Sequence, residues 1–334
     1  MEKAKTDIME KDCFFIKSAV ILQINGNPCP IIYICAMTFL SPNNFIDYEL
    51  LDCGDFLKLE RFGNYITIRP EPQAVWNTQL TMKDWEQKAH VKFMPQSSSS
   101  GIWKKMKDMP DQWQIKYAIN VDEEKHPIIK FRLGLTAFKH VGIFPEQSAN
   151  WDYIYNNIKK MKVENPKVLN LFAYTGGASL AAKAAGADVT HLDSIKQVVS
   201  WARENMEISG LENIRWVIED AMKFVKREKK RGNKYHGIIL DPPAYGHGPN
   251  GESWKLEEQI NEMMQSVATL LEEENHFIIL NTYSLGFSSL IIENLFRDFI
   301  CGKDMKNAEI GEIYLPASTG SKLPLGVFGR YYKG

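Results

Sequence analysis

Asp241-Pro242-Pro243 is the segment whose residue types point most directly to chemistry, and it follows the apolar run 237–240. Two consecutive prolines keep the backbone extended and prevent a helix from beginning at once. They also remove two N–H donors, so the segment offers only acceptors, namely its carbonyl groups and the Asp241 carboxylate. This row of acceptors, here called the Asp-Pro-Pro ledge, could orient an amino group or the polar edge of a base toward an electrophile. A surface turn is the alternative, and the position at a strand end argues against it.

A second candidate site lies where the apolar run 169–172 leads into Gly176 and Gly177 and then into a helix of small residues. Glycines let the backbone approach a ligand, and small residues let the helix lie close to the sheet. The run departs from the dinucleotide-binding fingerprint because Tyr174 occupies the first glycine position. A tight turn without a ligand is the alternative. The candidate residues are Phe172, Ala173, Tyr174, Thr175, Gly176 and Gly177.

Acidic residues end the next predicted strands. Asp193 has the position at which other nucleotide-binding sheets bind ribose hydroxyl groups. Asp220, followed by Ala221, could accept from an adenine amino group or cap the next helix, and one carboxylate can do both. The carboxyl ends of parallel strands meet at one edge of a sheet, so these acids and Asp241 are expected to line one cleft.

The elements that must position these residues begin after residue 148. Strands and helices alternate there, which predicts a parallel sheet covered on both faces. The last segment, 309–332, indicates a closing antiparallel hairpin. The fold class is therefore α/β, a mostly parallel, Rossmann-like sheet of seven strands in a domain over 148–334. Its first five strands are expected at 167–172, 188–192, 214–218, 236–240 and 276–280.

Before this sheet, short strands and turns predict a smaller β-rich domain over residues 45–147. Residues 1–44 lack clear periodicity and are interpreted as an N-terminal extension, dispensable before Met37; an edge hairpin is the alternative. Some tryptophans of this region could stack nucleobases, although filling a hydrophobic core is the preferred interpretation. These tryptophans are Trp76, Trp85, Trp103, Trp113 and Trp151.

Composition narrows the function classes. With 44% hydrophobic and 24% charged residues among 334, the chain has a globular composition. A net charge of −1 gives no overall attraction for a polyanion, so nucleic-acid binding would need a local patch. The basic run 223–234 is a candidate patch for phosphates, with a solvated helix end as the preferred alternative.

The hydropathy pattern and the five cysteines indicate where in the cell the protein acts and whether it binds a metal ion. No apolar stretch reaches eighteen residues, so no membrane span is expected. The cysteines are scattered without disulfide or zinc spacing, which favours a reducing, cytoplasmic environment and predicts no metal site. Four histidines flank strands and are interpreted as structural residues. They are His140, His191, His236 and His276.

In its motifs the chain resembles the class I S-adenosylmethionine-dependent methyltransferases, over roughly residues 50–334. In detail it is similar to the large-subunit ribosomal RNA methyltransferases with a Phe-x-Tyr-Thr-Gly first motif, matched by Phe172, Tyr174, Thr175 and Gly176. Asp241-Pro242-Pro243 matches the fourth motif, and 138–147 resembles the lead-in that reaches the methionine end of the cofactor.

The resemblance implies S-adenosylmethionine as the cofactor and RNA as the substrate. It implies that Gln147 and residues 172–177 line the methionine part, and that Asp193 binds the ribose. By the same resemblance, Asp220 and Ala221 lie at the adenine, and Asp241, Pro242 and Pro243 border the transferred methyl group.

Two departures from the family motifs concern the target atom. Members that methylate C5 of cytosine need a cysteine just after the fifth strand, where this chain has Tyr283. Amino-group methylases of the Asp-Pro-Pro-aromatic type have an aromatic residue in fourth place, where this chain has Ala244, with Tyr245 fifth. We therefore expect a nitrogen or oxygen acceptor and no cysteine nucleophile. Tyr283 joins the catalytic candidates, and both tyrosines are candidate stacking surfaces for a base turned out of its stack.

Three alternatives stay open. The chain could methylate a protein or a small molecule, because its near-neutral charge does not require a polyanion. It could be a noncatalytic RNA-binding module that retains the fold. A nicotinamide-dependent dehydrogenase on a similar sheet would leave Asp241-Pro242-Pro243 without a role.

Overall fold

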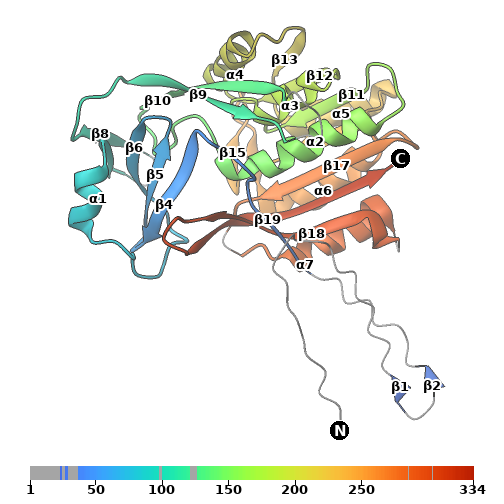
Figure 1. Cartoon of the computed structure of the whole chain (residues 1–334). Helices are drawn as coiled ribbons and strands as arrows, with labels where there is room; N and C mark the ends of the chain where they lie inside the picture. The colour runs from blue at the N-terminus through green and yellow to red at the C-terminus, as the bar shows by residue number, and fades with distance from the viewer. Residues whose placement is uncertain are drawn as a thin grey trace. The chain divides into compact units, whose positions relative to one another are not determined.

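One eight-stranded sheet organises the second half of the chain (Figure 1). Five of its strands are parallel, and a C-terminal antiparallel hairpin continues the sheet. The predicted fold class and the closing hairpin are confirmed. In spatial order the strands are β13 (Ile214–Ile218), β12 (Asp188–Asp193), β11 (Lys167–Leu171), β14 (Gly237–Leu240), β17 (His276–Thr282), β19 (Lys322–Lys333), β18 (Ala308–Pro316) and β3 (Thr38–Leu40).

The seven strands predicted for residues 148–334 are all present, and an eighth strand that was not predicted, β3, joins them from outside this region by pairing in parallel with β18, Thr38 lying opposite Gly311. Three residues without strong alternation give little sequence signal for a strand. The computed structural model describes residues 37–97, 100–120, 126–284, 286–302 and 304–334, together with the paired strands β1 (Gln23–Ile24) and β2 (Asn27–Pro28). The alternative hairpin within 14–39 lies largely outside the described residues.

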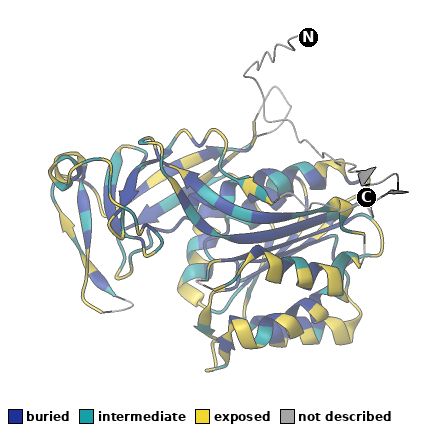
Figure 2. Cartoon of the chain, turned by 90° about the horizontal axis from the view of Figure 1, so that it is seen from below, coloured by how far each residue is buried: buried dark blue, intermediate teal, exposed yellow. Residues whose placement is uncertain are grey.

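The central strands are buried on both faces. Every residue of β14 and β17 is buried, as expected for parallel strands covered by helices (Figure 2). Ile239 and Ile279 face one hydrophobic cluster, whereas Ile238 and Ile278 face the other. The helices are α2 (Ser148–Lys160), α3 (Gly177–Ala184), α4 (Lys196–Ile208), α5 (Ala221–Arg231), α6 (Leu256–Ala268) and α7 (Ser289–Phe296), with a π-helical turn η2 (Arg297–Cys301) and a 3₁₀ turn η3 (Met305–Asn307).

A five-stranded sheet, one helix and a hairpin precede this fold. The helix α1 (Met82–Lys88) begins at a capping box formed by Thr81 and Asp84. The sheet contains, in order, β4 (Tyr48–Gly54), β5 (Leu57–Phe62), β6 (Tyr65–Pro70), β7 (Val91–Pro95) and β8 (Gly101–Lys105). The hairpin is β9 (Gln112–Ala118) and β10 (Ile128–Gly134), and the 3₁₀ turn η1 (Pro145–Gln147) leads into α2. A short hairpin, β15 (Tyr245–His247) and β16 (Ser253–Lys255), lies later in the chain.

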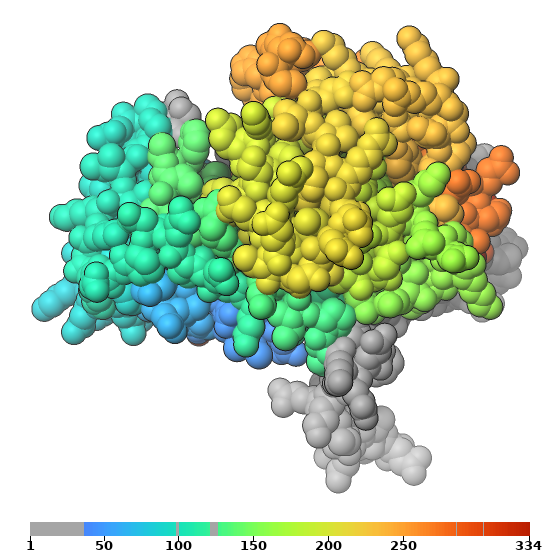
Figure 3. All heavy atoms as spheres, turned by 90° about the horizontal axis from the view of Figure 1, so that it is seen from above, coloured from blue at the N-terminus to red at the C-terminus, as the bar shows by residue number. Residues whose placement is uncertain are grey.

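The two parts of the chain share one hydrophobic cluster, and their atoms adjoin on the face seen in Figure 3. The hairpin strand β10 packs against α3 and α4, and Trp151 of α2 stacks on Phe131 of β10 at 5.1 Å between ring centroids. Trp85, Trp113 and Trp151 are 0, 8 and 4% exposed, so the interpretation of these tryptophans as core residues is confirmed. Residues 38–334 form one unit of contacts, and the division between 147 and 148 stays a prediction.

The C-terminal hairpin also contacts the first sheet. Between β18 and β19, the backbone N–H of Ser318 donates to the carbonyl of Leu50 at 2.8 Å. The Ser318 hydroxyl donates to Glu49 at 2.6 Å, and Thr319 donates to Asp52 at 2.8 Å. Residues near the end of the chain therefore satisfy some of the polar groups of β4.

A chain that starts at Met37 is expected to melt at the same temperature as the full-length protein, because β3 remains. A chain that starts at Ser41 lacks β3 and leaves β18 as an exposed edge, so we expect it to melt a few degrees lower. Thermal melting followed by circular dichroism measures both. A large loss in the Met37 chain would show that residues 1–36 belong to the core.

No helix in the part of the chain that the structure describes has both the length and the apolar composition needed to cross a bilayer.

Candidate active site

A cleft of about 830 Å³ lies at the carboxyl ends of the parallel strands. This is where ligands bind in open α/β sheets, and the volume is in the range of ligand pockets. Side chains of the N-terminal sheet line it as well, among them Lys58, Arg69 and Glu71. Ten predicted site residues line this cleft: Gln147, Phe172, Tyr174, Asp193, Asp220, Ala221, Asp241, Pro242, Pro243 and Tyr283.

The loop after β11 has an unusual backbone. Phe172 and Tyr174 have φ angles of 56° and 47°, a left-handed region that residues with a side chain seldom adopt. The N–H of Ala173 donates to the carbonyl of Leu192 at 3.0 Å, and the N–H of Tyr174 donates to Asp193 at 2.9 Å. The neighbouring strand β12 therefore holds the loop in this conformation, as strained backbone requires.

The structure adds a second reason for the paired glycines, besides the predicted approach of the backbone to a ligand. Gly176 has a φ of 94°, and a Cβ there would lie 3.2 Å from Ala202 of α4. A Cβ on Gly177 would lie 2.5 Å from the indole of Trp151. Both glycines therefore allow close packing of protein on protein. With Ala173 and Thr175 they line a smaller pocket of about 50 Å³ that shares a wall with the cleft.

Asp193 and Asp220 both make backbone hydrogen bonds at the cleft. The two oxygens of Asp193 accept from the N–H groups of Tyr174 and Ile195, at 2.9 and 3.0 Å. Burial raises the pKa of Asp193, and these hydrogen bonds oppose the rise. Asp220 caps α5 by accepting from the N–H of Lys223 at 2.8 Å, so its predicted capping role is confirmed. An ionised carboxyl has about four acceptor sites, so each can also bind a ligand.

Asp241 is the main acceptor of the Asp-Pro-Pro ledge. Its Oδ1 accepts from the amide of Asn281 at 3.0 Å, and burial raises its pKa to about 6. The Pro243 carbonyl, expected to be a free acceptor, instead accepts from the Trp254 indole at 2.7 Å. Trp254 lies on β16, a short strand that the sequence analysis did not predict.

Two amide side chains leave buried acceptors in the smaller pocket. Asn281 uses its Nδ2 on Asp241, and Asn150 donates from Nδ2 to Gln147 at 2.9 Å. In both, the Oδ1 atom is buried and has no hydrogen-bond partner among the described residues. Buried carbonyl oxygens are costly to leave unpaired, so this pocket is suited to a group that carries several donors.

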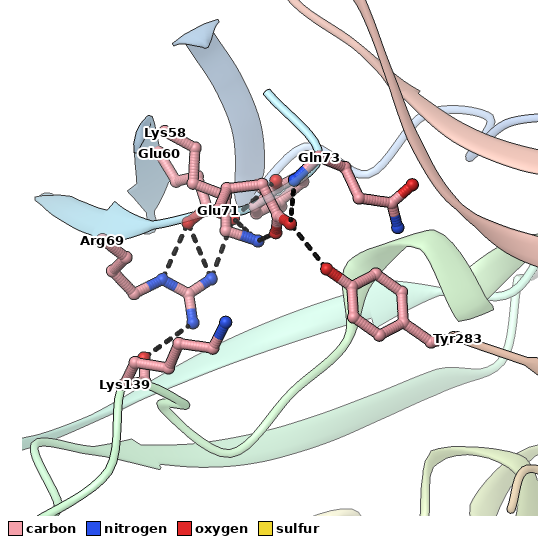
Figure 4. A network of polar contacts seen from close by, with 8 residues as sticks. Lys58, Glu60, Arg69, Glu71, Gln73, Lys139 and Tyr283 are labelled. Atoms are coloured by element: carbon pink, nitrogen blue, oxygen red, sulfur yellow. Dashed lines mark hydrogen bonds and ion pairs between the residues drawn. The ribbon is translucent and has the colours of Figure 1, made fainter. Parts of the chain in front are cut away.

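A charged cluster from the N-terminal sheet was missed by the sequence reasoning (Figure 4). Arg69 donates to Glu60 in a bidentate pair at 2.8 and 2.9 Å, and Lys58 pairs with Glu71 at 3.1 Å. The Tyr283 hydroxyl donates to Glu71 at 2.6 Å. A sequence pattern could have predicted this cluster. Charged residues stand at 58 and 60 in β5, and at 69 in β6 and 71 just after it. This spacing of two, in strands that pair with each other, puts the charged side chains on one face of the sheet.

The segment 138–147 contributes two titratable groups to the cleft, the buried Glu146 and the half-buried His140. Burial, with a smaller contribution from the nearby Asp241 carboxylate, raises the pKa of Glu146 to about 7. Burial and the positive charge of Arg69 lower the pKa of His140 to about 3. His140 therefore lines the cleft as a neutral side chain, and its interpretation as a structural residue stays a prediction.

The basic run 223–234 is largely neutralised. Four of its side chains pair with carboxylates, and Lys234 donates to the carbonyl groups of Thr269 and Leu271. The ion pairs are Lys223–Glu252, Lys226–Glu262, Arg227–Glu219 and Arg231–Glu228. These pairs favour the solvated helix end over a phosphate-binding patch.

The described part of the chain places neither a cysteine in the cleft nor a group of side chains arranged to hold a metal ion. The described cysteines, Cys53 and Cys301, do not line the cleft, and burial raises the pKa of each to about 11. Among the described residues, no three His, Cys, Asp or Glu side chains are grouped to hold a metal ion.

The fold and the cleft define a class of protein, and a family comparison agrees with them. Residues 106–299 match the model of the S-adenosylmethionine-dependent methyltransferases, more than half of the chain. The chain belongs to this family. The predicted class and its cofactor, S-adenosylmethionine, are thereby confirmed, and the dehydrogenase alternative is set aside.

Particular relatives refine this assignment. The crystal structure of a SAM-dependent methyltransferase from Agrobacterium tumefaciens is 34% identical, covers 89% of this chain and 94% of its own, and superposes with a TM-score of 0.79. The ribosomal RNA large subunit methyltransferase K/L of Shewanella frigidimarina is 30% identical over 171 residues, which are 48% of this chain and 23% of that protein. The chain thus matches about a quarter of the length of that relative.

A third similarity concerns the fold alone. SMU.776, crystallised as a methyltransferase complex with SAH, is 17% identical, with a TM-score of 0.65 over 86% of this chain and 76% of its own.

Proposed function

We propose that this chain transfers a methyl group from S-adenosylmethionine to a nitrogen or oxygen atom of RNA, without a cysteine nucleophile. The observation that carries the proposal is the half-buried Asp241 carboxylate, which lines one cleft with Asp193, Asp220 and Tyr283. An RNA substrate is supported by the relatives named as ribosomal RNA large subunit methyltransferases.

The residues present fit the cofactor. The unpaired oxygens of Asn150 and Asn281 are acceptors for an ammonium group such as that of the methionine part. Asp193 would accept from the ribose hydroxyl groups, and Asp220 with Ala221 would bind the adenine. Gln147 and the loop 172–177 would enclose the methionine part. When bound, the cofactor supplies a methyl group on a sulfonium, whose transfer needs chiefly positioning in a dry site.

The absence of a thiol from the described cleft supports a nitrogen or oxygen acceptor. Carbon-5 of cytosine is a weak nucleophile and needs prior attack by a thiolate. Tyr283 occupies the corresponding strand end, and its phenol has a raised pKa because of burial and the Glu71 charge. A neutral phenol does not replace a thiolate, whereas nitrogen and oxygen acceptors need only orientation by Asp241.

Two tyrosines give the cleft surfaces on which a base could stack. Tyr245 and Tyr283 line it and are 56 and 39% exposed. The Tyr245 hydroxyl hydrogen-bonds to the ring of His247 at 2.9 Å, which orients the Tyr245 side chain. A target base turned out of its stack would meet these rings. The free thiols of Cys53 and Cys301 favour the cytoplasm as the place of action.

Methyl transfer from tritiated S-adenosylmethionine into a cell extract, then separated into RNA, protein and small molecules, tests the proposal. Label is expected in the RNA. Label in protein or small molecules alone would replace RNA by one of those substrates, and no label in any fraction would favour a noncatalytic role. RNA containing 5-fluorocytosine is expected to form no covalent adduct, and its capture would contradict the proposed chemistry.

Replacing Asp193 with alanine is expected to weaken cofactor binding by about 1–3 kcal/mol, since a charged acceptor is lost. Calorimetry with S-adenosylmethionine measures the loss. A 2′,3′-dideoxy analogue is the control: removing the hydroxyl groups should cost affinity in the wild type and much less in the variant. An equal cost in both proteins would show that Asp193 acts only through the N–H groups of Tyr174 and Ile195.

A further inference from the structure

One hydrogen bond in the cleft joins residues 212 positions apart. Tyr283, just after β17, donates from its hydroxyl to Oε1 of Glu71, just after β6, at 2.6 Å (Figure 4). Glu71 is 3% exposed, whereas Tyr283 is 39% exposed, so the phenol lies between a buried carboxylate and the open cleft. Tyr283 lines the same cleft as Asp241, which is expected to border the transferred methyl group.

Before the reaction, Glu71 is an ionised carboxylate and Tyr283 is a protonated phenol. Burial raises the pKa of Glu71, but the Lys58 ammonium and the Tyr283 hydrogen bond outweigh burial, so the net pKa is lowered and the carboxyl is ionised at neutral pH. The other Glu71 oxygen pairs with Lys58 at 3.1 Å. Tyr283 therefore donates its proton to a carboxylate, and its oxygen keeps lone pairs that can accept from a ligand.

Methylation of an N–H or O–H group must release a proton. We propose that Tyr283 accepts this proton and passes its own to Glu71, an inference that rests on the proposed methyl transfer. As the lone pair of the acceptor bonds to the methyl carbon, the carbon–sulfur bond breaks and its electrons stay on sulfur. The acceptor proton moves to Tyr283 Oη while the Tyr283 proton moves to Glu71 Oε1. Tyr283 is again a phenol, and Glu71, now neutral, later releases its proton to water.

This relay narrows the substrate class. An exocyclic amino group, an amide N–H or a hydroxyl group has a proton to give. A ring nitrogen that carries only a lone pair, or a carbon, does not give one to the relay in the transfer step. Tyr283 is the catalytic residue in this scheme, and Glu71 is a positioning residue that acts through it.

The experiment compares Tyr283→Phe, Glu71→Gln and the double variant in the tritium-transfer assay on the extract. We expect kcat to fall about 100-fold in each single variant, the range for a positioned proton acceptor, with no further loss in the double variant. KM should change little, and calorimetric affinity for S-adenosylhomocysteine should stay within twofold. Glu71→Asp, which keeps the charge, should recover part of kcat.

A matched control exists in the same chain. Tyr235 donates to Glu228 at 2.8 Å in a buried Tyr–Glu pair that does not line the cleft. Tyr235→Phe and Glu228→Gln should leave kcat unchanged, even if they lower the melting temperature. An equal loss in the control pair would mean that only structure had been disturbed, and the relay would be abandoned.

The outcomes separate the relay from the RNA proposal. Label in protein or metabolites would overturn RNA as the substrate, while the variants would still judge the relay on that product. Product analysis that places the methyl on a carbon, or on a ring nitrogen without a hydrogen, would overturn the relay. Full turnover by folded Tyr283→Phe would overturn it as well, and a wild type that labels no fraction would overturn both.

Discussion

Asp241→Ala is expected to lower kcat about 100-fold while weakening the binding of S-adenosylhomocysteine less than tenfold. The removal of one preorganised polar contact at a reacting centre typically has an effect of this size on the rate. The Asp241 carboxylate is half-buried and is held in place by the Asn281 amide. Single-turnover kinetics and calorimetry measure the two quantities. A variant that loses affinity and rate equally would show that Asp241 only binds the cofactor.

A different substitution of Asp241, Asp241→Asn, is expected to raise the stability of the protein. Burial raises the pKa of Asp241 to about 6, from about 3.8 in the unfolded chain, so ionisation of this carboxyl opposes folding. Asp241→Asn removes that cost and keeps an oxygen for the Asn281 amide. We expect it to melt above the wild type at pH 7.5, with the difference vanishing below about pH 4, where the carboxyl is neutral in both states. A constant difference across this range would point to another cause.

Trp151→Ala is expected to destabilise the protein by about 3–5 kcal/mol, the usual cost of removing a large buried aromatic side chain. The indole is 4% exposed, stacks on Phe131 and lies at an edge contact with Tyr117. It also fills the space beside Gly177, so the cofactor loop should lose its support. Denaturant unfolding measures the stability. Trp216→Ala, at a partly buried indole on the edge strand β13, should cost clearly less, and an equal cost would contradict the packing argument.

The strand ends of the parallel sheet could be predicted from the sequence because local patterns specify them. Apolar runs such as 237–240 are long enough for buried strands, and parallel topology brings their carboxyl ends to one edge. Asp193, Asp220 and Asp241 follow such runs, so a shared cleft was predicted for all three and the structure has it. The capping role of Asp220 was likewise visible, because it depends on the adjacent residues alone.

Contacts between distant segments could not be predicted from local patterns. A charged side chain next to a strand, such as Glu71, is usually at the surface, and nothing near it in sequence indicates a partner at Tyr283. The reason for Gly177 lies in Trp151, whose indole occupies the space of a Cβ. Strand β3 is too short to show a period, and its pairing with β18 depends on a residue about 270 positions away.

That last pairing has a consequence for synthesis on the ribosome. Strands β3 and β4 emerge early, but their partners Gly311, Ser318 and Thr319 are made about 270 residues later. At roughly 5–20 residues per second, the early segment waits more than ten seconds with its edge unpaired. A nascent chain halted before β18 should therefore be cut by protease near β4, and completing the hairpin should protect it. The last strands to be made would then close the first sheet to be formed.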